Sequence, residues 1–591
     1  MKISINRNIV WCDVFIDQLV NLGVKYACVS PGSRSTPLII SFSGNKNITM
    51  HTIVDERSSA FFALGLAKKS NTPVVLVTTS GTAVAELYPA IIEAYYQRIP
   101  LIIITADRPP ILRNSGANQT INQHNIYSNH IRFFADAGLP NIQKLSSMKK
   151  LATDAFEHAC VIDRGPVHLN FPFEKPFEPK SYTDKIDVVK LEKLFSSATP
   201  TVKATNENHI ALKSLAKRFS YTKKGLILIG YSYYANEFPE EVVKFSKKFG
   251  YPIYVDGSSS LRFGSHAKTN IIDNLTAIVR SGQFRKDYDP DLIIQFGGAP
   301  TSNVLLEFFK NSSAEKILVN RFGDKNDPSQ TAKTVLAIDA ALFCKTLDSF
   351  DITTGKSSWL ESIRRMNKIA VHQKENIIRR APFMFEGKIA DELFENIPAK
   401  SDVMISNSLP IRDVDFFASA NNKQINIFTN RGASGIDGIN STAVGIARAS
   451  NNPTFLLTGD LAFYHDLNGI YNSIKFKVPL TVVLINNDGG GIFHSLPISD
   501  YPEIFAENFL TPMELNFAKL VQAYGGQFRK IRSWEEFRKK LGRSAGINKL
   551  TVLEIRTDAI RSKLQRQKYW NAVANKIDEF INESRRRRYR I

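Results

Sequence analysis

The chain has few cysteines, and they lie far apart. Its 591 residues include only four, and no two of them form a CxxC pair. This scarcity excludes a disulfide framework and a structural zinc site, because both need clustered cysteines. The first residues also lack the apolar core of a signal peptide, so we expect a cytoplasmic protein. The four cysteines are Cys12, Cys28, Cys160 and Cys344.

Long hydrophobic runs are lacking as well. The longest, such as residues 99–106, have the length of a strand and fall well short of the roughly 18 residues that a membrane-spanning helix needs. Hydrophobic residues make up 43% of the chain and charged residues 22%, which is typical of a folded globular protein. We therefore expect no membrane span, and the length predicts about three or four domains.

Acidic residues are too few to balance the basic ones. Lysine and arginine number 76 against 56 aspartates and glutamates, which gives a net charge of +20. Such a charge is compatible with nucleic acid, an anionic membrane surface or polyanionic small substrates as partners. The basic residues are spread along the chain, however, and the one dense block, residues 585–590, is simplest to interpret as a solvated chain end. A nucleic-acid-binding protein is therefore the less favoured alternative, and it predicts salt-sensitive binding without cofactor dependence.

Short apolar runs alternate with helical patterns along most of the chain. Helical spacing is clearest at residues 58–69 and 82–96, between strand-like runs. Repeated strand, loop and helix predicts three doubly wound parallel α/β sheets in series. The strand-like runs are residues 25–30, 50–55, 73–79 and 99–106 in the first block, 224–232, 251–257, 291–300 and 315–320 in the second, and 402–407, 425–430, 453–459 and 479–487 in the third.

These blocks define the expected domains. The proline-rich segment 171–182 predicts an exit linker from the first domain, because proline lacks a backbone donor and restricts the residue before it. We expect α/β domains at residues 1–180, 200–350 and 355–560, followed by a basic C-terminal tail at 561–591.

Polar residues follow two successive strands of the third block. Gly459 and Asp460 follow the run at 453–458, and Asn487 comes after the run at 479–485. Ligands collect at the carboxyl ends of parallel strands, and a carboxylate paired with an amide oxygen suits a hard cation such as Mg²⁺. A lone aspartate after a strand is more often a helix cap, but the pair of motifs favours a metal site that holds a diphosphate. Gly489 allows close backbone approach and can offer its carbonyl as a third ligand.

The two motifs resemble the metal–diphosphate motif of thiamine-diphosphate enzymes, although Leu461 stands where many of those enzymes have glycine. Further segments are similar to one group within that family, the carboligating synthases of menaquinone biosynthesis. This resemblance covers nearly the whole chain and is thinnest in the middle. The segments that carry it are residues 29–38, 78–94, 105–110, 115–123 and 430–449.

The resemblance implies a transferase that uses thiamine diphosphate and Mg²⁺ (or Mn²⁺). Enzymes of the group decarboxylate 2-oxoglutarate and add the resulting unit to isochorismate. Another thiamine-diphosphate-dependent 2-oxo acid decarboxylase or carboligase is the alternative, and a pyruvate enzyme would have no distal carboxylate to hold. The resemblance also implies a homodimer, or a homotetramer built from two, because the cofactor in this family lies between domains of different subunits.

The resemblance further assigns roles to single residues. Glu56 matches the acid that hydrogen-bonds the pyrimidine ring, although a first-turn glutamate usually only complements a helix dipole. Arginines suit the two dianionic substrates, because a guanidinium pairs with a carboxylate. Asn303 stands near the position of a family lysine, which leaves open whether the middle domain contributes to the site. The catalytic set is Glu56, Arg34, Asn118 and Gln119; the cofactor set is Glu56, Ser434, Ile436, Gly459, Asp460, Leu461, Asn487 and Gly489, of which Asp460, Asn487 and Gly489 bind the metal; and the substrate set is Ser408, Arg412, Arg431, Ile492 and Phe493.

Overall fold

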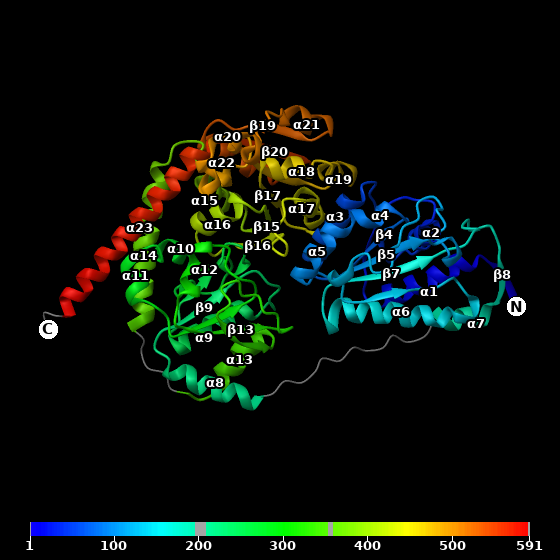
Figure 1. The fold of residues 1–591 in the computed structure, drawn as a ribbon, viewed down its shortest axis with the longest axis horizontal. Coiled ribbons are helices and arrows are strands. Elements are labelled where there is room, and N and C mark those ends of the chain that lie inside the picture. Colours follow the sequence, from blue (N-terminus) through cyan, green and yellow to red (C-terminus); the bar gives the residue numbers. More distant parts are fainter. Residues whose placement is uncertain (1, 196–208, 353–357, 589–591) are drawn as a thin grey trace.

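The computed structural model describes residues 2–195, 209–352 and 358–588. These residues form three six-stranded parallel sheets, one after another along the chain, and one two-stranded antiparallel ladder. Figure 1 shows the first sheet on the right in blue and cyan, the second at the lower left in green, and the third above it in yellow and orange. The predicted fold class, three doubly wound α/β sheets in series, is confirmed.

The first and third sheets have the same strand order. It is β3-β2-β4-β5-β7-β6 in the first and β16-β15-β17-β18-β20-β19 in the third. The chain therefore reverses its direction across each sheet beside the first strand, and ligands of open parallel sheets bind at such a switch point. The first sheet consists of β2 (Tyr26–Val29), β3 (Thr49–Thr52), β4 (Val74–Thr78), β5 (Leu101–Asp107), β6 (Phe134–Asp136) and β7 (Pro166–Pro172). The third consists of β15 (Lys400–Ile405), β16 (Gln424–Thr429), β17 (Thr454–Gly459), β18 (Leu480–Asn486), β19 (Gln527–Lys530) and β20 (Leu550–Arg556).

The middle sheet has a different order, β11-β10-β9-β12-β13-β14. Its switch point lies between the first and fourth of its strands, so this domain is not a third copy of the other two. Its strands are β9 (Gly225–Ile229), β10 (Ile253–Val255), β11 (Ile271–Ile272), β12 (Leu292–Phe296), β13 (Glu315–Asn320) and β14 (Ala332–Ala337).

Helices connect the strands, because neighbouring parallel strands need a crossover long enough to return to the same edge of the sheet. The first domain contains α1 (Arg7–Asn21), α2 (Thr36–Gly44), α3 (Glu56–Ser70), α4 (Thr82–Glu86), α5 (Tyr88–Gln97), α6 (Leu145–Glu157) and α7 (Val188–Phe195). The middle of the chain contains α8 (His209–Tyr221), α9 (Phe238–Phe249), α10 (Leu275–Ile278), α11 (Gly282–Asp287), α12 (Asn303–Lys310), α13 (Ala340–Ser349) and α14 (Ser358–Arg380). The last part contains α15 (Glu386–Asn396), α16 (Leu409–Phe417), α17 (Ile439–Ala449), α18 (Asp460–His465), α19 (Gly469–Lys475), α20 (Pro502–Phe505), α21 (Phe517–Ala523), α22 (Trp534–Ser544) and α23 (Ala559–Arg588).

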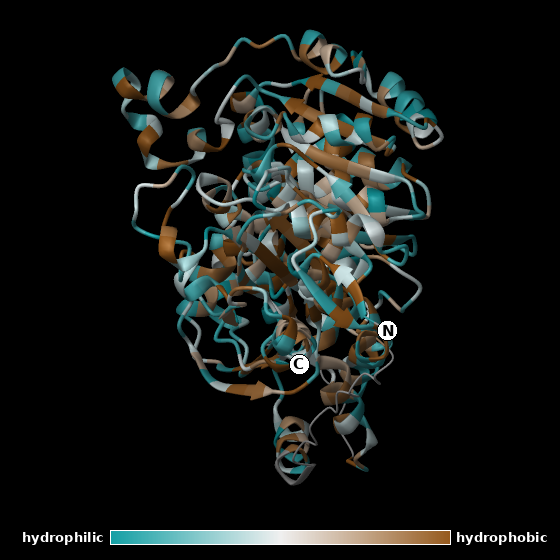
Figure 2. Cartoon of the chain, turned by 90° about the vertical axis from the view of Figure 1, so that its right-hand side faces the viewer, coloured by the Kyte–Doolittle hydropathy of each residue, from teal (hydrophilic) through white to brown (hydrophobic). Residues whose placement is uncertain are grey.

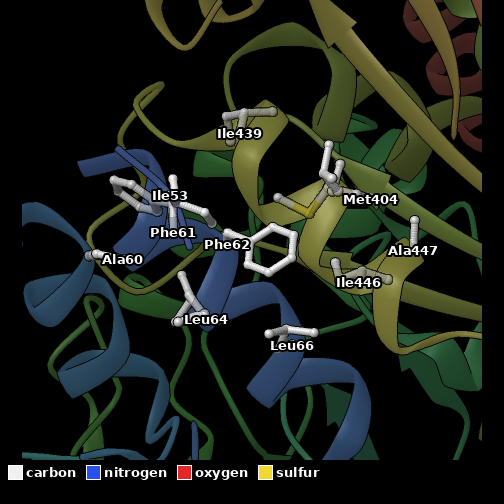
Figure 3. Close-up of a cluster of buried hydrophobic side chains, with 14 of the residues drawn as sticks. Ile53, Ala60, Phe61, Phe62, Leu64, Leu66, Met404, Ile439, Ile446 and Ala447 are labelled. Atoms are coloured by element: carbon white, nitrogen blue, oxygen red, sulfur yellow. The ribbon is translucent and has the colours of Figure 1, made fainter. Parts of the chain in front are cut away.

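Helix α3 of the first domain packs directly on helix α17 of the third. A Cβ atom on Gly65 would lie 2.1 Å from the carbonyl oxygen of Thr442, and one on Gly445 would lie equally close to that of Phe62. Only glycine permits this approach of two helix backbones. Apolar side chains surround the crossing and join both domains in one buried cluster (Figure 3), among them Phe61, Leu64, Leu66, Ile439 and Ile446.

The first domain continues beyond the expected linker. Strand β7 runs through Pro172, so the interpretation of residues 171–182 as a linker was wrong for its first two residues. Proline is tolerated there because it stands at the end of the strand, where few ladder bonds are lost. The chain then returns to its own beginning, where β8 (Asp184–Asp187) pairs antiparallel with β1 (Lys2–Ile5).

The expected basic tail forms a long helix as far as the structure describes it. Helix α23 spans 30 residues and lies beside α14 and the middle domain, in red at the left of Figure 1. Its apolar residues recur every fourth position and are buried, which is the spacing of one helix face. They are Tyr569, Val573, Ile577 and Ile581. The last two residues of the basic block, 589 and 590, lie outside the described part.

Hydropathy follows the layers of the fold. In Figure 2 the strands that run through the interior are brown, whereas teal is concentrated on helices and loops at the outside. The core strands β4 and β18 are buried along their whole length, as expected for parallel strands with both faces covered. None of the helices in the described part of the chain is long and apolar enough to cross a membrane.

Candidate active site

Asp460 joins the two loops of the predicted metal motif. Strand β17 ends at Gly459, and Asp460 opens helix α18 with its side chain almost fully buried. One carboxylate oxygen accepts a hydrogen bond from the backbone N–H of Leu461 at 2.7 Å, and the other accepts one from Gly489 at 3.0 Å. Burial raises the pKa of Asp460 to about 6, although the backbone donors oppose the shift. The structure therefore brings the loop after β18 onto the aspartate at the end of β17.

Asn487 presents an unused oxygen beside this aspartate loop. Its Nδ2 donates to Oε1 of Glu386 at 2.8 Å, whereas its Oδ1 is buried and has no hydrogen-bond partner. A buried acceptor without a donor is costly unless another group satisfies it, and a cation does so. Gly489 is needed in this loop, because its φ is +139° and a Cβ would lie 2.1 Å from the carbonyl oxygen of Leu510.

These residues fit a hard divalent cation whose ligands come partly from the protein and partly from a diphosphate. Within the described part of the chain, no group of three or more His, Cys, Asp or Glu side chains could hold a metal ion. One carboxylate, one amide oxygen and one carbonyl leave several positions of an octahedral ion for phosphate oxygens and water. The carbonyl of Gly489 also accepts a hydrogen bond from Gly491 at 3.0 Å, which leaves it one further lone pair.

The loop after β16 carries Arg431, Ser434 and Ile436. Asn407 holds the loop in shape, because its Nδ2 donates to the carbonyls of Asn430 at 2.6 Å and of Gly435 at 2.7 Å. Arg431 in turn donates to Oδ1 of Asn407 at 3.3 Å. Ser434 has a left-handed backbone with φ of 64°, and Ile436 packs against the cluster between the first and third domains.

The first domain clamps this loop from both sides. The N–H groups of Gly432 and Ala433 donate to the carboxylate of Glu93 at 2.8 and 2.7 Å. The ammonium of Lys68 donates to the carbonyl of Thr429 at 2.6 Å and to the side chain of Asn430 at 2.7 Å. Lys68 is fully buried, and burial lowers its pKa to about 8. One negative and one positive side chain, from α5 and α3, therefore fix the loop that carries Arg431.

A large cavity lies where the three domains meet. Its volume is about 760 Å³, and Arg412 and Arg431 line it together with Asn303 of the middle domain. Arg412 donates to the carbonyl of Ser408 at 2.6 Å, and burial followed by the nearby charge of Arg431 lowers its pKa. In the described part of the chain neither arginine has a carboxylate partner, so the cavity offers two guanidinium groups to an anion.

The middle domain contributes more to this cavity than Asn303 alone. Besides Asn303, residues at the ends of β9, β12 and β13 line the same space. The middle domain therefore lines this cavity together with the first and third domains. Further basic residues at the cavity are Arg98, Arg164, Arg321 and Lys325.

Glu56 lies between two residues that contact the segment following the metal motif: Arg57 donates to the carbonyl of His465 at 3.1 Å, and Asp55 accepts from Asn468 at 3.1 Å. Glu56 is the first residue of α3 and is half-buried, and burial is the largest of the effects that raise its pKa. In the described part of the chain it makes no hydrogen bond or ion pair with Asp460 or Asn487. The neighbouring Val54 is 71% exposed. In the described part of the chain, Glu56 and the predicted metal ligands are therefore not in direct contact.

Arg34, Asn118 and Gln119 form a second group at the carboxyl edge of the first sheet. Arg34 donates to the carbonyl of Phe173 at 2.7 Å, and its Nε is buried without a partner. Burial lowers its pKa to about 10, and the nearby Arg108 adds to this effect. Gln119 lies against Gly81 at the start of α4. None of the three predicted residues lines the cavity that holds Arg412 and Arg431.

Sequence reasoning missed several residues of these sites. Arg108 follows β5 directly and donates to the carbonyl of Asn118 at 2.6 Å, so its place after a strand was the signal that could have found it. Lys68 lies in the last turn of α3 and Glu93 in the middle of α5, where single charges usually face solvent, and nothing local marks either residue. Two residues that the sequence did predict, Ile492 and Phe493, lie in the short helical turn Gly491–Ser495. The ring of Phe493 packs edge-on against that of Phe509, with 5.6 Å between the ring centroids.

Family models match all three parts of the chain. The model described as "Thiamine pyrophosphate enzyme, N-terminal TPP binding domain" matches residues 11–126, and "Thiamine pyrophosphate enzyme, C-terminal TPP binding domain" matches residues 418–555. "Middle domain of thiamine pyrophosphate" matches residues 188–405. The expectation that thiamine diphosphate is the cofactor is confirmed by these matches.

Curated relatives carry one name over nearly the full length. That name is 2-succinyl-5-enolpyruvyl-6-hydroxy-3-cyclohexene-1-carboxylate synthase. The protein of Oceanobacillus iheyensis is 38% identical over 95% of this chain and 97% of its own, and that of Bacillus cytotoxicus is 37% identical over 96% and 97%. The protein of Haloquadratum walsbyi is 34% identical over 97% and 99%. The chain belongs to this synthase family.

Membership in the synthase family makes the protein a thiamine-diphosphate-dependent transferase of the carboligase kind, as the resemblance implied. The same overall fold recurs in a more distant protein. The crystal structure of benzoylformate decarboxylase from Polynucleobacter necessarius superposes with a TM-score of 0.67 over 93% of this chain and 98% of that one. Its 16% identity supports the fold alone.

Proposed function

We propose that the protein decarboxylates 2-oxoglutarate and joins the remaining four-carbon unit to isochorismate, as a synthase of menaquinone biosynthesis. The main structural support for this proposal is the cavity at the junction of the three domains. It presents Arg412 and Arg431 without carboxylate partners in the described chain, and a guanidinium pair matches a substrate with more than one carboxylate.

The cofactor would be held by the metal motif of the third domain. Asp460 and Asn487 would bind Mg²⁺ or Mn²⁺ with the carbonyl of Gly489, and Gly459 and Leu461 would line the diphosphate. When bound, thiamine diphosphate supplies the carbon nucleophile and the electron sink for decarboxylation. Manganese is an equally suitable ion for this ligand set, because both prefer oxygen ligands in octahedral geometry.

Glu56 would share a proton with a ring nitrogen of the pyrimidine. A carboxyl group whose pKa is raised by burial suits this task, because burial favours the protonated form that can donate to the ring nitrogen. Ile436, with Ser434 beside it, would support the bent cofactor from the loop after β16. The clamp by Lys68 and Glu93 would keep that loop in place during turnover.

The substrates would be divided between the two groups of polar residues. Ser408 and Arg412 would hold the distal carboxylate of 2-oxoglutarate, which pyruvate lacks. Arg34, Asn118, Gln119 and Arg431 would serve isochorismate, and Ile492 and Phe493 would offer its ring an apolar face.

A homodimer would complete the site, because the cofactor of this enzyme group lies between domains of different subunits. The exposed apolar side chains near the first sheet's carboxyl edge, Val54, Ile111 and Leu112, are suited to an interface with a second copy. Two such dimers would give a homotetramer.

The remaining expectations concern the surroundings of the protein. The free cysteines, Cys12, Cys28, Cys160 and Cys344, fit a reducing cytoplasm. The positive charge would serve dianionic substrates rather than nucleic acid.

The test is a direct assay of the reaction. The purified protein is supplied with thiamine diphosphate, Mg²⁺, 2-oxoglutarate and isochorismate, and the loss of isochorismate absorbance is followed. We expect loss that requires every component, and replacement of 2-oxoglutarate by pyruvate should abolish it. Equal rates with pyruvate would favour another 2-oxo acid carboligase, and no cofactor-dependent loss would overturn the proposal.

A further inference from the structure

The amide of Asn487 has a fixed orientation in the structure. An amide group has one donor side and one acceptor side, and the side that faces a carboxylate must be the donor, because an ionised carboxylate only accepts. Glu386 therefore selects the orientation in which Nδ2 points back into the protein and Oδ1 is left unpaired. A neutral side chain that can both donate and accept, such as glutamine, would favour neither orientation of the Asn487 amide.

Glu386 is itself held from several sides. It is the first residue of α15 and only 1% exposed, and its Oε1 also accepts from the hydroxyl of Thr557 at 3.0 Å. Its other oxygen accepts from Nη2 of Arg566 at 2.6 Å. Its backbone N–H donates to the hydroxyl of Ser562 at 3.3 Å. Arg566 and Ser562 both belong to α23, so the last helix fixes the carboxylate that orients Asn487.

Arg566 links the carboxylate of Glu386 to α16, the helix that carries the proposed substrate residue Arg412. Its Nε and Nη2 donate to both oxygens of Asp413 at 2.7 and 2.6 Å, and Asp413 is the neighbour of Arg412 on α16. The guanidinium is 4% exposed, and the two carboxylates raise its pKa. A buried cation between two buried carboxylates is retained only when each partner is in place, since removing one leaves an uncompensated charge.

We propose that Glu386, held by Arg566 of the last helix, is a positioning residue that turns the amide oxygen of Asn487 toward the metal ion. This inference rests on the proposed metal site. It adds a role for α23, none of whose residues belongs to the proposed cofactor or substrate sets. Groups behind a metal ligand that fix its orientation commonly change metal affinity by about 10–100-fold when they are replaced.

The first test replaces the carboxylate by its neutral isostere. In Glu386→Gln the new amide can pair with either side of Asn487, so both orientations become accessible. Thiamine diphosphate is titrated into the protein by calorimetry at a series of fixed Mg²⁺ concentrations. We expect the Mg²⁺ concentration that gives half-maximal cofactor binding to rise by about 10–100-fold. The matched control is Glu392→Gln on the same helix, because Glu392 also binds an arginine, Arg538 at 2.7 and 2.6 Å, but does not contact Asn487.

The second test exchanges the roles of donor and acceptor. Asn487→Asp places a carboxylate against Glu386 and should weaken Mg²⁺-dependent cofactor binding more than Glu386→Gln does. In the double variant Glu386→Gln with Asn487→Asp, the glutamine amide can donate to one aspartate oxygen and leave the other for the metal. We expect the double variant to bind Mg²⁺ more tightly than Asn487→Asp alone, which a merely destabilised protein would not do.

The outcomes separate this inference from the proposed function. Identical Mg²⁺ dependence in Glu386→Gln, Glu392→Gln and the unchanged protein would overturn the positioning role and leave the metal site standing. Failure of the double variant to improve on Asn487→Asp would also overturn it. If Asp460→Ala leaves the Mg²⁺ dependence unchanged, the metal site itself is misplaced, and the role of Glu386 falls with it.

Discussion

Glu56 combines a half-buried carboxyl with a pKa raised by burial. We expect Glu56→Gln to bind thiamine diphosphate and Mg²⁺ nearly as well as the unchanged protein but to lose about 10²–10⁴-fold in turnover, because the amide cannot exchange a proton with the cofactor ring. Calorimetry measures the binding and isochorismate loss the turnover. Glu361→Gln on the surface of α14 is the control and should change neither. Normal turnover in Glu56→Gln would remove Glu56 from catalysis.

Arg412 is half-buried at the cavity and has no carboxylate partner in the described chain. We expect Arg412→Ala to raise the KM for 2-oxoglutarate by about 10–100-fold, since a charge-assisted hydrogen bond is worth about 1.5–3 kcal/mol. Cofactor affinity should stay unchanged. Arg365→Ala, a 64% exposed arginine of α14, is the control. Parallel losses in substrate and cofactor affinity would place Arg412 outside the substrate pocket.

His51 is a buried neutral group between the first and third domains. Its Nε2 accepts a hydrogen bond from Arg448 at 3.0 Å, and burial together with that charge lowers its pKa to about 4 from the ordinary 6.5. The unfolded chain therefore binds more protons than the folded one between these values. The free energy of unfolding should fall as the pH drops from 6.5 toward 4, by at most about 1.4 kcal/mol per pH unit from this residue.

The measurement is the thermal midpoint of the unchanged protein and of His51→Gln between pH 7.5 and 5. Glutamine keeps an acceptor for Arg448 but does not titrate, so its curve should be shallower. Buried His168, whose pKa is lowered to about 3, leaves a residual slope in both proteins. Equal slopes would show that His51 is not protonated on unfolding in this range.

Among the elements, α3 and α17 depend on the two glycines at their crossing. We expect Gly65→Ala to lower the free energy of unfolding by about 1–3 kcal/mol, because its methyl group would overlap the carbonyl of Thr442. Denaturant unfolding measures the change. Gly542→Ala on the exposed side of α22 is the control; nothing lies within 4 Å of the added atom, and it should stabilise that helix by about 0.5–1 kcal/mol. Unchanged stability in Gly65→Ala would mean that the helices separate at little cost.

Most strands at the centre of each sheet could be predicted from the sequence, because continuous apolar runs mark strands buried on both faces. Edge strands such as β11 and β14 were missed, since β11 has only two residues and β14 is half-exposed. The interior strands β7 and β20 were missed as well, because polar residues such as His168 and Glu554 interrupt their apolar runs. Helix α23 was missed because its buried positions are separated by many charged residues that dominate the composition. Its four-residue spacing was nevertheless present in the sequence.

The candidate site was predictable where chemistry lies next to strand ends. Asp460 and Asn487 follow successive strands, so local order alone brings them together. Glu386 and Arg566 are 101 and 180 positions from the groups that they contact, Asn487 and Glu386 respectively, and no local pattern marks either. Such partners become visible only when tertiary packing places helices from both ends of the third domain behind one loop.

At the scale of the whole molecule, the proposed homodimer predicts that each active site is shared between two chains. The inactive variants Glu56→Gln and Asp460→Ala are mixed, dissociated and reassembled. If one chain supplies the acid and another the metal ligands, each mixed dimer contains one intact site, and a 1:1 mixture should recover about a quarter of the unchanged activity. The separate variants, treated in the same way, are the controls. A mixture as inactive as its components would place both groups in one chain's own site.

Helix α23 has a consequence for how the protein is made. Of all the helices described, it leaves the ribosome last, and it carries the one guanidinium that neutralises Glu386 and Asp413. A nascent chain halted before Arg566 would hold two uncompensated acids in its interior, with nothing to set the Asn487 amide. Binding of the vitamin-derived cofactor should therefore weaken sharply in a chain shortened to lack Arg566.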